Sequence, residues 1–184
     1  QVPGRAAGGL GGLDGLVHNG GIRRRGKGPA SCVWGGDMSG AGKVKAPFQR
    51  GRAAIPVMAA SGGGAIGNTA SCWGVHPGPD HAVDCMTKAA IASLTQCMGR
   101  DHAHQGIRIN AVCPNEVDTP MLRTGFEMRG FDPTTAVAEL DKTVPLGRIA
   151  QPGDIAEVVL FLASDHARYM CGSLVEVNGG KPVA

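Results

Sequence analysis

The sequence has 184 residues, of which 42% are hydrophobic, and a formal net charge of +3. This length suits one domain with a hydrophobic core and is too short for two. No apolar run is long enough to cross a bilayer, and the first ten residues, QVPGRAAGGL, lack the features of a secretory signal. We therefore expect a cytoplasmic chain without membrane association.

The six cysteines are scattered without a C-x-x-C pair, so the sequence predicts neither a zinc site nor a redox motif. Positive charge is concentrated in residues 21–52, which hold eight Lys or Arg residues against Asp37 alone. This segment shows no apolar periodicity and no interleaved aromatic residues, so we interpret it as an irregular, solvated loop. A nucleic-acid-binding arm is the alternative. Positive charge alone does not define a nucleic-acid-binding site, so we do not expect nucleic-acid binding.

The first elements predicted along the chain are short. Residues 1–12 are rich in glycine and are interpreted as a linker. Residues 13–19, LDGLVHN, predict a buried strand that ends in a turn. After the basic segment, residues 52–61 predict a helix that contains Pro56, and residues 65–71, AIGNTAS, predict a weak strand and its loop.

A long amphipathic helix is predicted from residue 82. Its apolar residues follow helical spacing for several turns, and Gly106 is a plausible stop. Asp84 and Lys88 are four positions apart, which predicts an ion pair on one helix face. The loop before the helix carries His76 and His81, for which substrate contact and simple solvation both stay open.

Strands and helices then alternate to the end of the chain. Residues 107–114 predict a strand, residues 132–142 and 152–164 predict helices, and residues 172–180 predict a last strand with a glycine turn. This alternation predicts an α/β fold, a parallel sheet with helices on both faces. In such sheets ligands bind beyond the carboxyl ends of the strands.

Several motifs occur in a fixed order along the chain. HNGG is similar to N-N-A-G, NTAS to a strand that delivers a serine, and DCMTK to Y-x-x-x-K. RINAVCPNEVDTP is similar to N-x-V-x-P-G-x-x-x-T-P, PLGRIAQPGDIA precedes the last helix, and VNGG is similar to V-D-G-G. From about Leu13 to the C-terminus, apart from the basic segment, the chain thus resembles the short-chain dehydrogenase/reductase family. The resemblance implies a Rossmann-like fold and NAD(P)-dependent interconversion of an alcohol and a ketone, similar to a 3-oxoacyl reductase.

The same resemblance implies the catalytic residues. It places Ser71 as the serine that polarises the substrate carbonyl, and Lys88 as the lysine that supports the catalytic tyrosine and holds the nicotinamide ribose. Asp84 stands at the tyrosine position, and Lys43 stands at the position of the asparagine that orients a relay water. The only tyrosine of the chain, Tyr169, is distant in sequence. A carboxylate beside a lysine has no proton to give at neutral pH, so we expect a severe loss of reductase activity.

The coenzyme, NAD or NADP, is implied to contact residues that follow the predicted strands. These residues are Asn19, Gly20, Gly21, Lys88, Pro114, Val117 and Thr119. The family's N-terminal strand and T-G-x-x-x-G-x-G turn have no counterpart in the sequence, so we expect one partial domain over residues 1–184 that lacks the glycine-rich βαβ unit. Gln1 in place of an initiator methionine agrees with a processed or truncated start.

Further family features concern the substrate and the assembly. Residues 120–143 correspond to a substrate lid whose apolar cover would come from Met121, Leu122, Phe126, Met128 and Phe131. The helix over residues 82–104 implies a homodimer or tetramer, so a non-catalytic oligomerising or binding protein is the alternative function. No metal site is predicted, because His102 and His104 are two positions apart and do not share a helix face.

Overall fold

The computed structural model describes residues 12–20, 41–79 and 81–181. Within these ranges four parallel strands form one sheet in the order β1-β2-β3-β4. The strands are β1 (Gly15–His18), β2 (Gly64–Thr69), β3 (Ile107–Pro114) and β4 (Leu174–Val177). Parallel neighbours need a long crossover, and a helix supplies each one.

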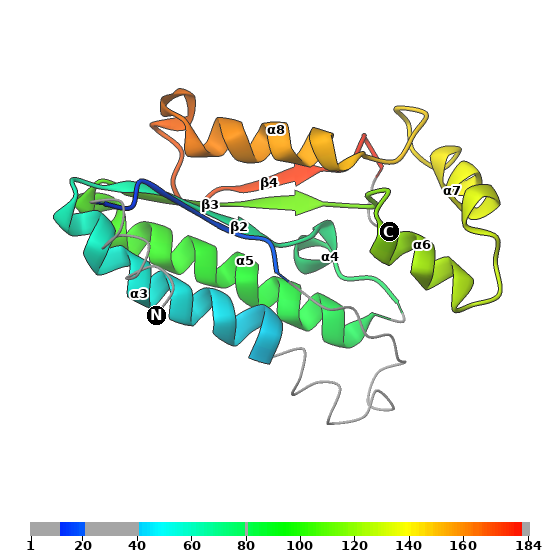
Figure 1. Ribbon diagram of the computed structural model, residues 1–184, viewed down its shortest axis with the longest axis horizontal. Helices are drawn as coiled ribbons and strands as arrows, with labels where there is room; N and C mark the ends of the chain where they lie inside the picture. The colour runs from blue at the N-terminus through cyan, green and yellow to red at the C-terminus, as the bar shows by residue number, and fades with distance from the viewer. Residues whose placement is uncertain (1–11, 21–40, 80, 182–184) are drawn as a thin grey trace.

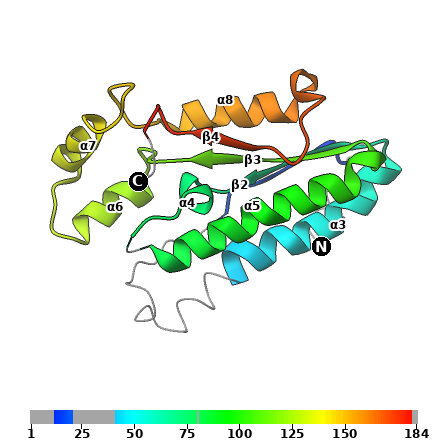
Figure 2. The same cartoon turned by 180° about the vertical axis from the view of Figure 1, so that it is seen from behind.

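Long helices cover both faces of the sheet (Figures 1 and 2). The helices α3 (Ala46–Ala60) and α5 (Ala82–His102) lie on one face, and α8 (Pro152–Ala163) lies on the other. This arrangement confirms the predicted Rossmann-like α/β fold. It also turns the carboxyl ends of all four strands toward one end of the molecule.

Shorter elements complete the described fold. They are the π-helical turn η2 (Ala41–Lys45), α4 (Cys72–Val75), η3 (Ala103–Gln105), α6 (Pro120–Glu127), α7 (Pro133–Asp141) and η4 (Asp165–Ala167). Figure 1 shows that α4, α6 and α7 gather at the carboxyl ends of the strands. The sequence predicted α7, but it predicted neither α4 nor α6, which are short and carry little periodicity.

The basic segment does not stay irregular to residue 52. Residues 41–60 are helical throughout, as η2 followed by α3. Pro47 lies in the first turn of α3, where its missing N–H is not needed, and Ala54 and Met58 are fully buried by the sheet. Tertiary packing therefore extends this helix beyond its predicted start. Residues 1–11 and 21–40, with the rest of the predicted linker and basic segment, lie outside the described residues.

The main core lies between the sheet and the helices α3 and α5. It consists of the buried residues Ile55, Met58, Ile66, Met98, Ile107 and Ile109. Fully burying such a side chain stabilises the fold by roughly 1.5–3 kcal/mol. The core ends where polar side chains begin, near the carboxyl ends of the strands.

One buried polar chain links β1, β2 and α5. His18 Nδ1 donates to Asn68 Oδ1 (2.8 Å), Asn68 Nδ2 donates to Thr95 Oγ1 (2.9 Å), and Thr95 Oγ1 donates to the Ile91 carbonyl (2.8 Å). His18 Nε2 is buried and has no partner among the described residues. Burial, with a smaller contribution from the charge of Arg50, lowers the pKa of His18 below its usual 6.5. Burial therefore favours the neutral imidazole in the folded chain.

This histidine makes stability dependent on pH. Because its folded pKa is lowered, the unfolded chain binds a proton near pH 6.5 that the folded chain resists, so stability falls as the pH drops through 6.5. We expect the wild type to lose up to roughly 1.4 kcal/mol per pH unit more than His18→Asn does between pH 6.5 and 5.5. Urea denaturation at both pH values measures this, and equal losses in the two proteins would contradict it.

Candidate active site

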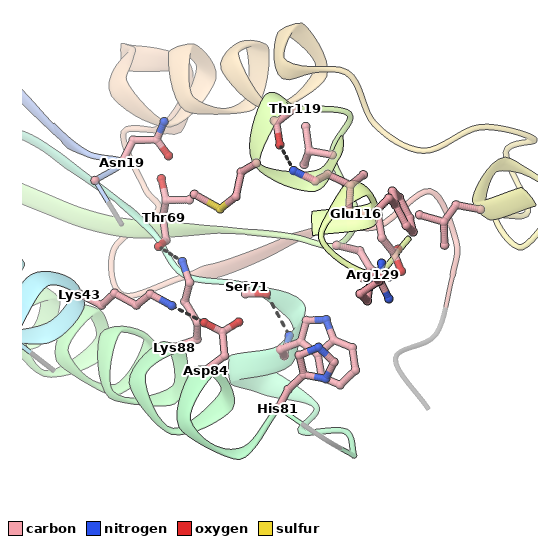
Figure 3. A pocket seen from close by; sticks show the side chains of 18 residues that line it. Asn19, Lys43, Thr69, Ser71, His81, Asp84, Lys88, Glu116, Thr119 and Arg129 are labelled. Carbon is pink, nitrogen blue, oxygen red and sulfur yellow. Dashed lines mark hydrogen bonds and ion pairs between the residues drawn. The ribbon is translucent and has the colours of Figure 1, made fainter. Parts of the chain in front are cut away.

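A cavity of about 420 Å³ lies at the carboxyl ends of β1, β2 and β3 (Figure 3). Its lining residues are Asn19, Gly20, Lys43, Thr69, Ser71, Trp73, His81, Asp84, Lys88, Asn115, Glu116, Val117, Thr119, Met121, Leu122, Phe126, Arg129 and Leu140. The cavity thus collects all four predicted catalytic residues and most of the predicted coenzyme contacts. Pro114 is not among the lining residues, but its carbonyl accepts a hydrogen bond from Ser71 Oγ. Gly21 lies outside the described residues.

Ser71 is held at the start of α4. Its Oγ accepts a hydrogen bond from the Trp73 backbone N–H (3.2 Å) and donates to the Pro114 carbonyl (3.3 Å). A Cβ added to Gly74 would lie 2.6 Å from the Lys88 carbonyl carbon, so this glycine allows α4 to pack directly on the α5 backbone. The close approach brings the serine and the lysine to the same cavity.

Lys88 reaches the cavity from α5. Its Nζ donates to the Thr69 carbonyl at the end of β2 (2.9 Å), which leaves two N–H groups for other partners. Burial lowers the pKa of Lys88 to about 8, an effect that nearby Asp84 partly offsets and Lys43 strengthens. The amine is thus poised between its charged and neutral forms near physiological pH.

Asp84 pairs with Lys43, not with Lys88. Lys43 Nζ donates to Asp84 Oδ1 across 41 positions of sequence, and the predicted i,i+4 pair is wrong. Only 6% of the Lys43 side chain and 16% of the Asp84 side chain are exposed. Figure 3 shows this pair beside Lys88. Lys88 prefers the Thr69 carbonyl because α5 presents it to the end of β2.

The loop after β3 is fixed by several bonds. Val117 forms a bridge with Ala150, and the Asp118 backbone N–H donates to the Ala150 carbonyl (2.8 Å). The Arg123 guanidinium donates to both carboxylate oxygens of Asp118 (2.7 Å each) and holds the pKa of that group below its usual value. Thr119 then caps α6 by accepting from the Leu122 N–H (3.3 Å). The loop is therefore rigid where it meets the cavity.

The apolar side chains of residues 120–143 differ in their burial. Leu122 and Phe126 are buried in a cluster with Val137, Val144 and Ile149, and they also line the cavity. Met121 lines the cavity but is half exposed, whereas Met128 and Phe131 are exposed. The apolar cover thus comes from one face of α6.

Sequence reasoning missed Thr69, Trp73, Arg129 and Leu140 as lining residues. Trp73 stacks against His81 with ring centroids 4.6 Å apart, so that histidine belongs to the cavity wall. Thr69 lies in the NTAS motif, in which only the serine was expected to act, and the other three lie outside the motifs. Only proximity to Ser71 in sequence pointed to Trp73. Their placement depends on how α4 and α6 fold over the strand ends.

The described ranges contain neither a metal-binding cluster nor a membrane-spanning helix. No group of three or more His, Cys, Asp or Glu side chains there is close enough to hold a metal ion. None of the helices described is long and apolar enough to span a membrane.

The fold and cavity define a Rossmann-like α/β protein with a cavity at the carboxyl ends of its strands. The sequence model described as "Enoyl-(Acyl carrier protein) reductase" matches residues 2–181. The chain belongs to the short-chain dehydrogenase/reductase family. Dehydrogenases of this family act on small molecules and generally use NAD(P).

Individual relatives agree with this assignment. The chain is 37% identical to 4-formylbenzenesulfonate dehydrogenase of Comamonas testosteroni over 95% of its length and 69% of that protein. It is also 37% identical to inactive 2-(S)-hydroxypropyl-CoM dehydrogenase 2 of Xanthobacter autotrophicus, over 93% and 74% of the two chains. The ligand-free aldohexose dehydrogenase of Thermoplasma acidophilum superposes with a TM-score of 0.94 at 27% identity, covering 100% of this chain and 73% of that one.

These relatives are longer than the present chain. The chain spans 69% and 74% of the two curated relatives named above, while 95% and 93% of the chain is matched. It thus corresponds to about two thirds of such a protein.

Proposed function

We propose that this chain is a NAD(P)-dependent oxidoreductase that interconverts an alcohol and a ketone, similar to a 3-oxoacyl reductase, with impaired proton transfer. The observation that carries the proposal is the convergence of Ser71, Lys88 and Thr119 on one cavity at the strand ends. These are the positions that match the serine, lysine and threonine of the family motifs. The family's dehydrogenases support the reaction class.

The polar groups of the cavity fit the ribose and nicotinamide end of the coenzyme. Lys88 has two N–H groups beyond its bond to Thr69, which suits the two hydroxyls of a ribose. Asn19 and Thr119 line the same cavity and offer polar groups for the carboxamide and its surroundings. A bound nicotinamide coenzyme supplies the hydride acceptor or donor.

The protein's own residues then act on the reacting oxygen. The Ser71 hydroxyl can turn from the Pro114 carbonyl to a substrate carbonyl oxygen and donate a hydrogen bond there. Lys88, when protonated, stabilises the negative charge that develops on that oxygen. Asp84 Oδ1 accepts a hydrogen bond from Lys43, so this carboxylate is engaged in an ion pair. The proton transfer that a tyrosine hydroxyl performs in the family is therefore the impaired step of the proposal.

Coenzyme binding tests this proposal. We expect NADH or NADPH to bind the wild-type chain saturably at or below millimolar concentration, followed by nicotinamide fluorescence. Lys88→Met should weaken binding by about tenfold because it removes a charged donor. Lys142→Met is the matched control, because it changes an exposed lysine that directly follows α7. Absence of saturable binding at millimolar coenzyme would overturn the proposal.

A second candidate function is that of a non-catalytic, oligomerising member of the family. It is favoured by an apolar groove between η2, α3 and α5, lined by Val44, Lys45, Phe48, Met86, Thr87, Ala90 and Leu94. Phe48 is 51% and Met86 61% exposed, which is unusual for large apolar side chains on one surface. We propose that a second copy covers this groove to form a homodimer or tetramer.

Light scattering tests the assembly. The wild-type chain should have the mass of a dimer or tetramer, and Phe48→Glu should shift it toward the monomer because a buried unpaired charge disfavours the interface. Phe161→Glu, which changes an exposed aromatic residue on α8, is the control. A wild-type chain that is monomeric at micromolar concentration would count against this candidate.

A further inference from the structure

Arg129 is a cation of the cavity that neither the family motifs nor the proposed reaction uses. It follows α6 and lines the cavity together with Ser71 and Lys88. Figure 3 shows it on the side formed by the lid, across the cavity from Lys43 and Lys88. A cation in this place lies at a distance from the reacting groups and faces the space that a substrate would fill.

Aromatic rings and a backbone carbonyl fix its guanidinium group. The guanidinium carbon lies 4.7 Å from the centre of the Phe126 ring and 5.5 Å from that of the Phe131 ring. Its Nε donates to the Gly125 carbonyl (2.8 Å). Stacking and this bond restrain the planar group, so less side-chain freedom is lost when it binds a ligand.

The two terminal nitrogens remain available. Within the described residues no carboxylate pairs with Arg129. Its Nε donates to the Gly125 carbonyl, and its two terminal nitrogens form no hydrogen bond there. The acidic residues of the cavity are engaged elsewhere, since Asp84 binds Lys43 and Glu116 binds Lys181 (2.9 Å). The free fork matches the geometry of a carboxylate or sulfonate, which it can bind through two parallel hydrogen bonds.

The charges of the cavity lining also favour an anionic ligand. Asp84 pairs with Lys43, and Glu116 Oε1 pairs with Lys181, while Glu116 Oε2 is buried without a partner among the described residues. Lys88 and Arg129 line the same cavity, and neither forms an ion pair within the described residues. The apolar side chains of Met121, Leu122 and Leu140 line the same cavity as Arg129. Such a site suits a molecule with an apolar body and an anionic end.

We propose that Arg129 binds an anionic group on the substrate, so that the substrate class is a small organic acid whose alcohol or ketone lies toward Ser71. This inference rests on the proposed function for the identity of the reacting group. The anionic end would be a carboxylate or a sulfonate, because both present two oxygens to a guanidinium fork.

Two ketones of the same shape test the proposal by calorimetry, 4-acetylbenzoate and its neutral counterpart 4-acetylbenzamide. The wild-type chain should bind the acid at least about tenfold more tightly than the amide, as expected for a charge-assisted bidentate contact. Arg129→Met should remove this preference without weakening the amide, and Arg129→Lys should keep part of it. Arg100→Met, which changes an exposed arginine in the last turn of α5, should leave the preference intact.

The outcomes separate this inference from the proposed function. Equal affinity for the two ketones, a preference that survives in Arg129→Met, or no binding of 4-acetylbenzoate at millimolar concentration would each overturn it. NADH affinity, measured on the same proteins, should be unchanged in Arg129→Met, and a tenfold loss would assign the arginine to the coenzyme instead. A normal acid preference in a chain that binds no coenzyme would support the anion site and count only against the oxidoreductase.

Discussion

Lys43→Met is expected to lower the free energy of unfolding by about 3 kcal/mol, because removing one partner of a buried ion pair leaves the other charge without compensation. The two side chains are only 6% and 16% exposed, so water from the cavity replaces the lost ammonium group at Asp84 only in part. Their bond also joins η2 to α5, two elements that lie far apart in sequence. Urea denaturation at pH 7 measures the effect.

A double-mutant cycle isolates the pair from other effects of the change. Lys43→Met combined with Asp84→Leu should recover most of the lost stability, because no unpaired charge remains. The control is Lys142→Met, which breaks the exposed pair with Glu139 and should cost less than about 1 kcal/mol. If Lys43→Met costs no more than this control, the pair is not a buried one in solution.

The sequence was sufficient to predict the sheet and the main helices. Alternating strand and helix patterns, with ordered family motifs, predicted all four strands and the helices α5, α7 and α8. Side-chain periodicity carries this information because each of these elements buries one face in the core. Helix α3 was predicted only from residue 52, since its first turns, APFQRG, contain a proline and a glycine and show no apolar periodicity. These turns are helical because of tertiary packing.

The pairing inside the cavity could not be predicted in the same way. Local spacing favours Asp84 with Lys88, but the partner is Lys43, which comes from another part of the chain. Arg129 lies in none of the motifs, and the position of its guanidinium depends on contacts with the rings of Phe126 and Phe131. Motifs thus predict which residues converge on the strand ends, and tertiary structure decides which of them bond.

The bond between Lys43 and Asp84 affects how a tyrosine should be introduced at position 84. We propose that they occupy the family's asparagine and tyrosine positions, so the two replacements compensate each other. Asp84→Tyr alone would leave Lys43 as a buried cation without its carboxylate and should destabilise the chain. Lys43→Asn with Asp84→Tyr avoids that cost and supplies both a proton donor and a neutral relay residue.

The double variant should therefore gain alcohol oxidation. A correctly placed general acid or base contributes roughly two to four orders of magnitude, so we expect an increase of about 10²-fold to 10⁴-fold over the wild type. Adding Lys88→Met to the double variant should remove the gain, because the tyrosine then lacks the cation that lowers its pKa. Circular dichroism on each variant separates loss of folding from loss of chemistry.

The measurement that tests the account most directly is the rate of NADH formation from a secondary alcohol by the wild type and by Lys43→Asn/Asp84→Tyr, at saturating coenzyme and equal folded concentration. We predict a rate at least about 10²-fold higher in the double variant. Equal rates in the two folded proteins would contradict the claim that this cavity is an oxidoreductase site whose proton donor has been replaced.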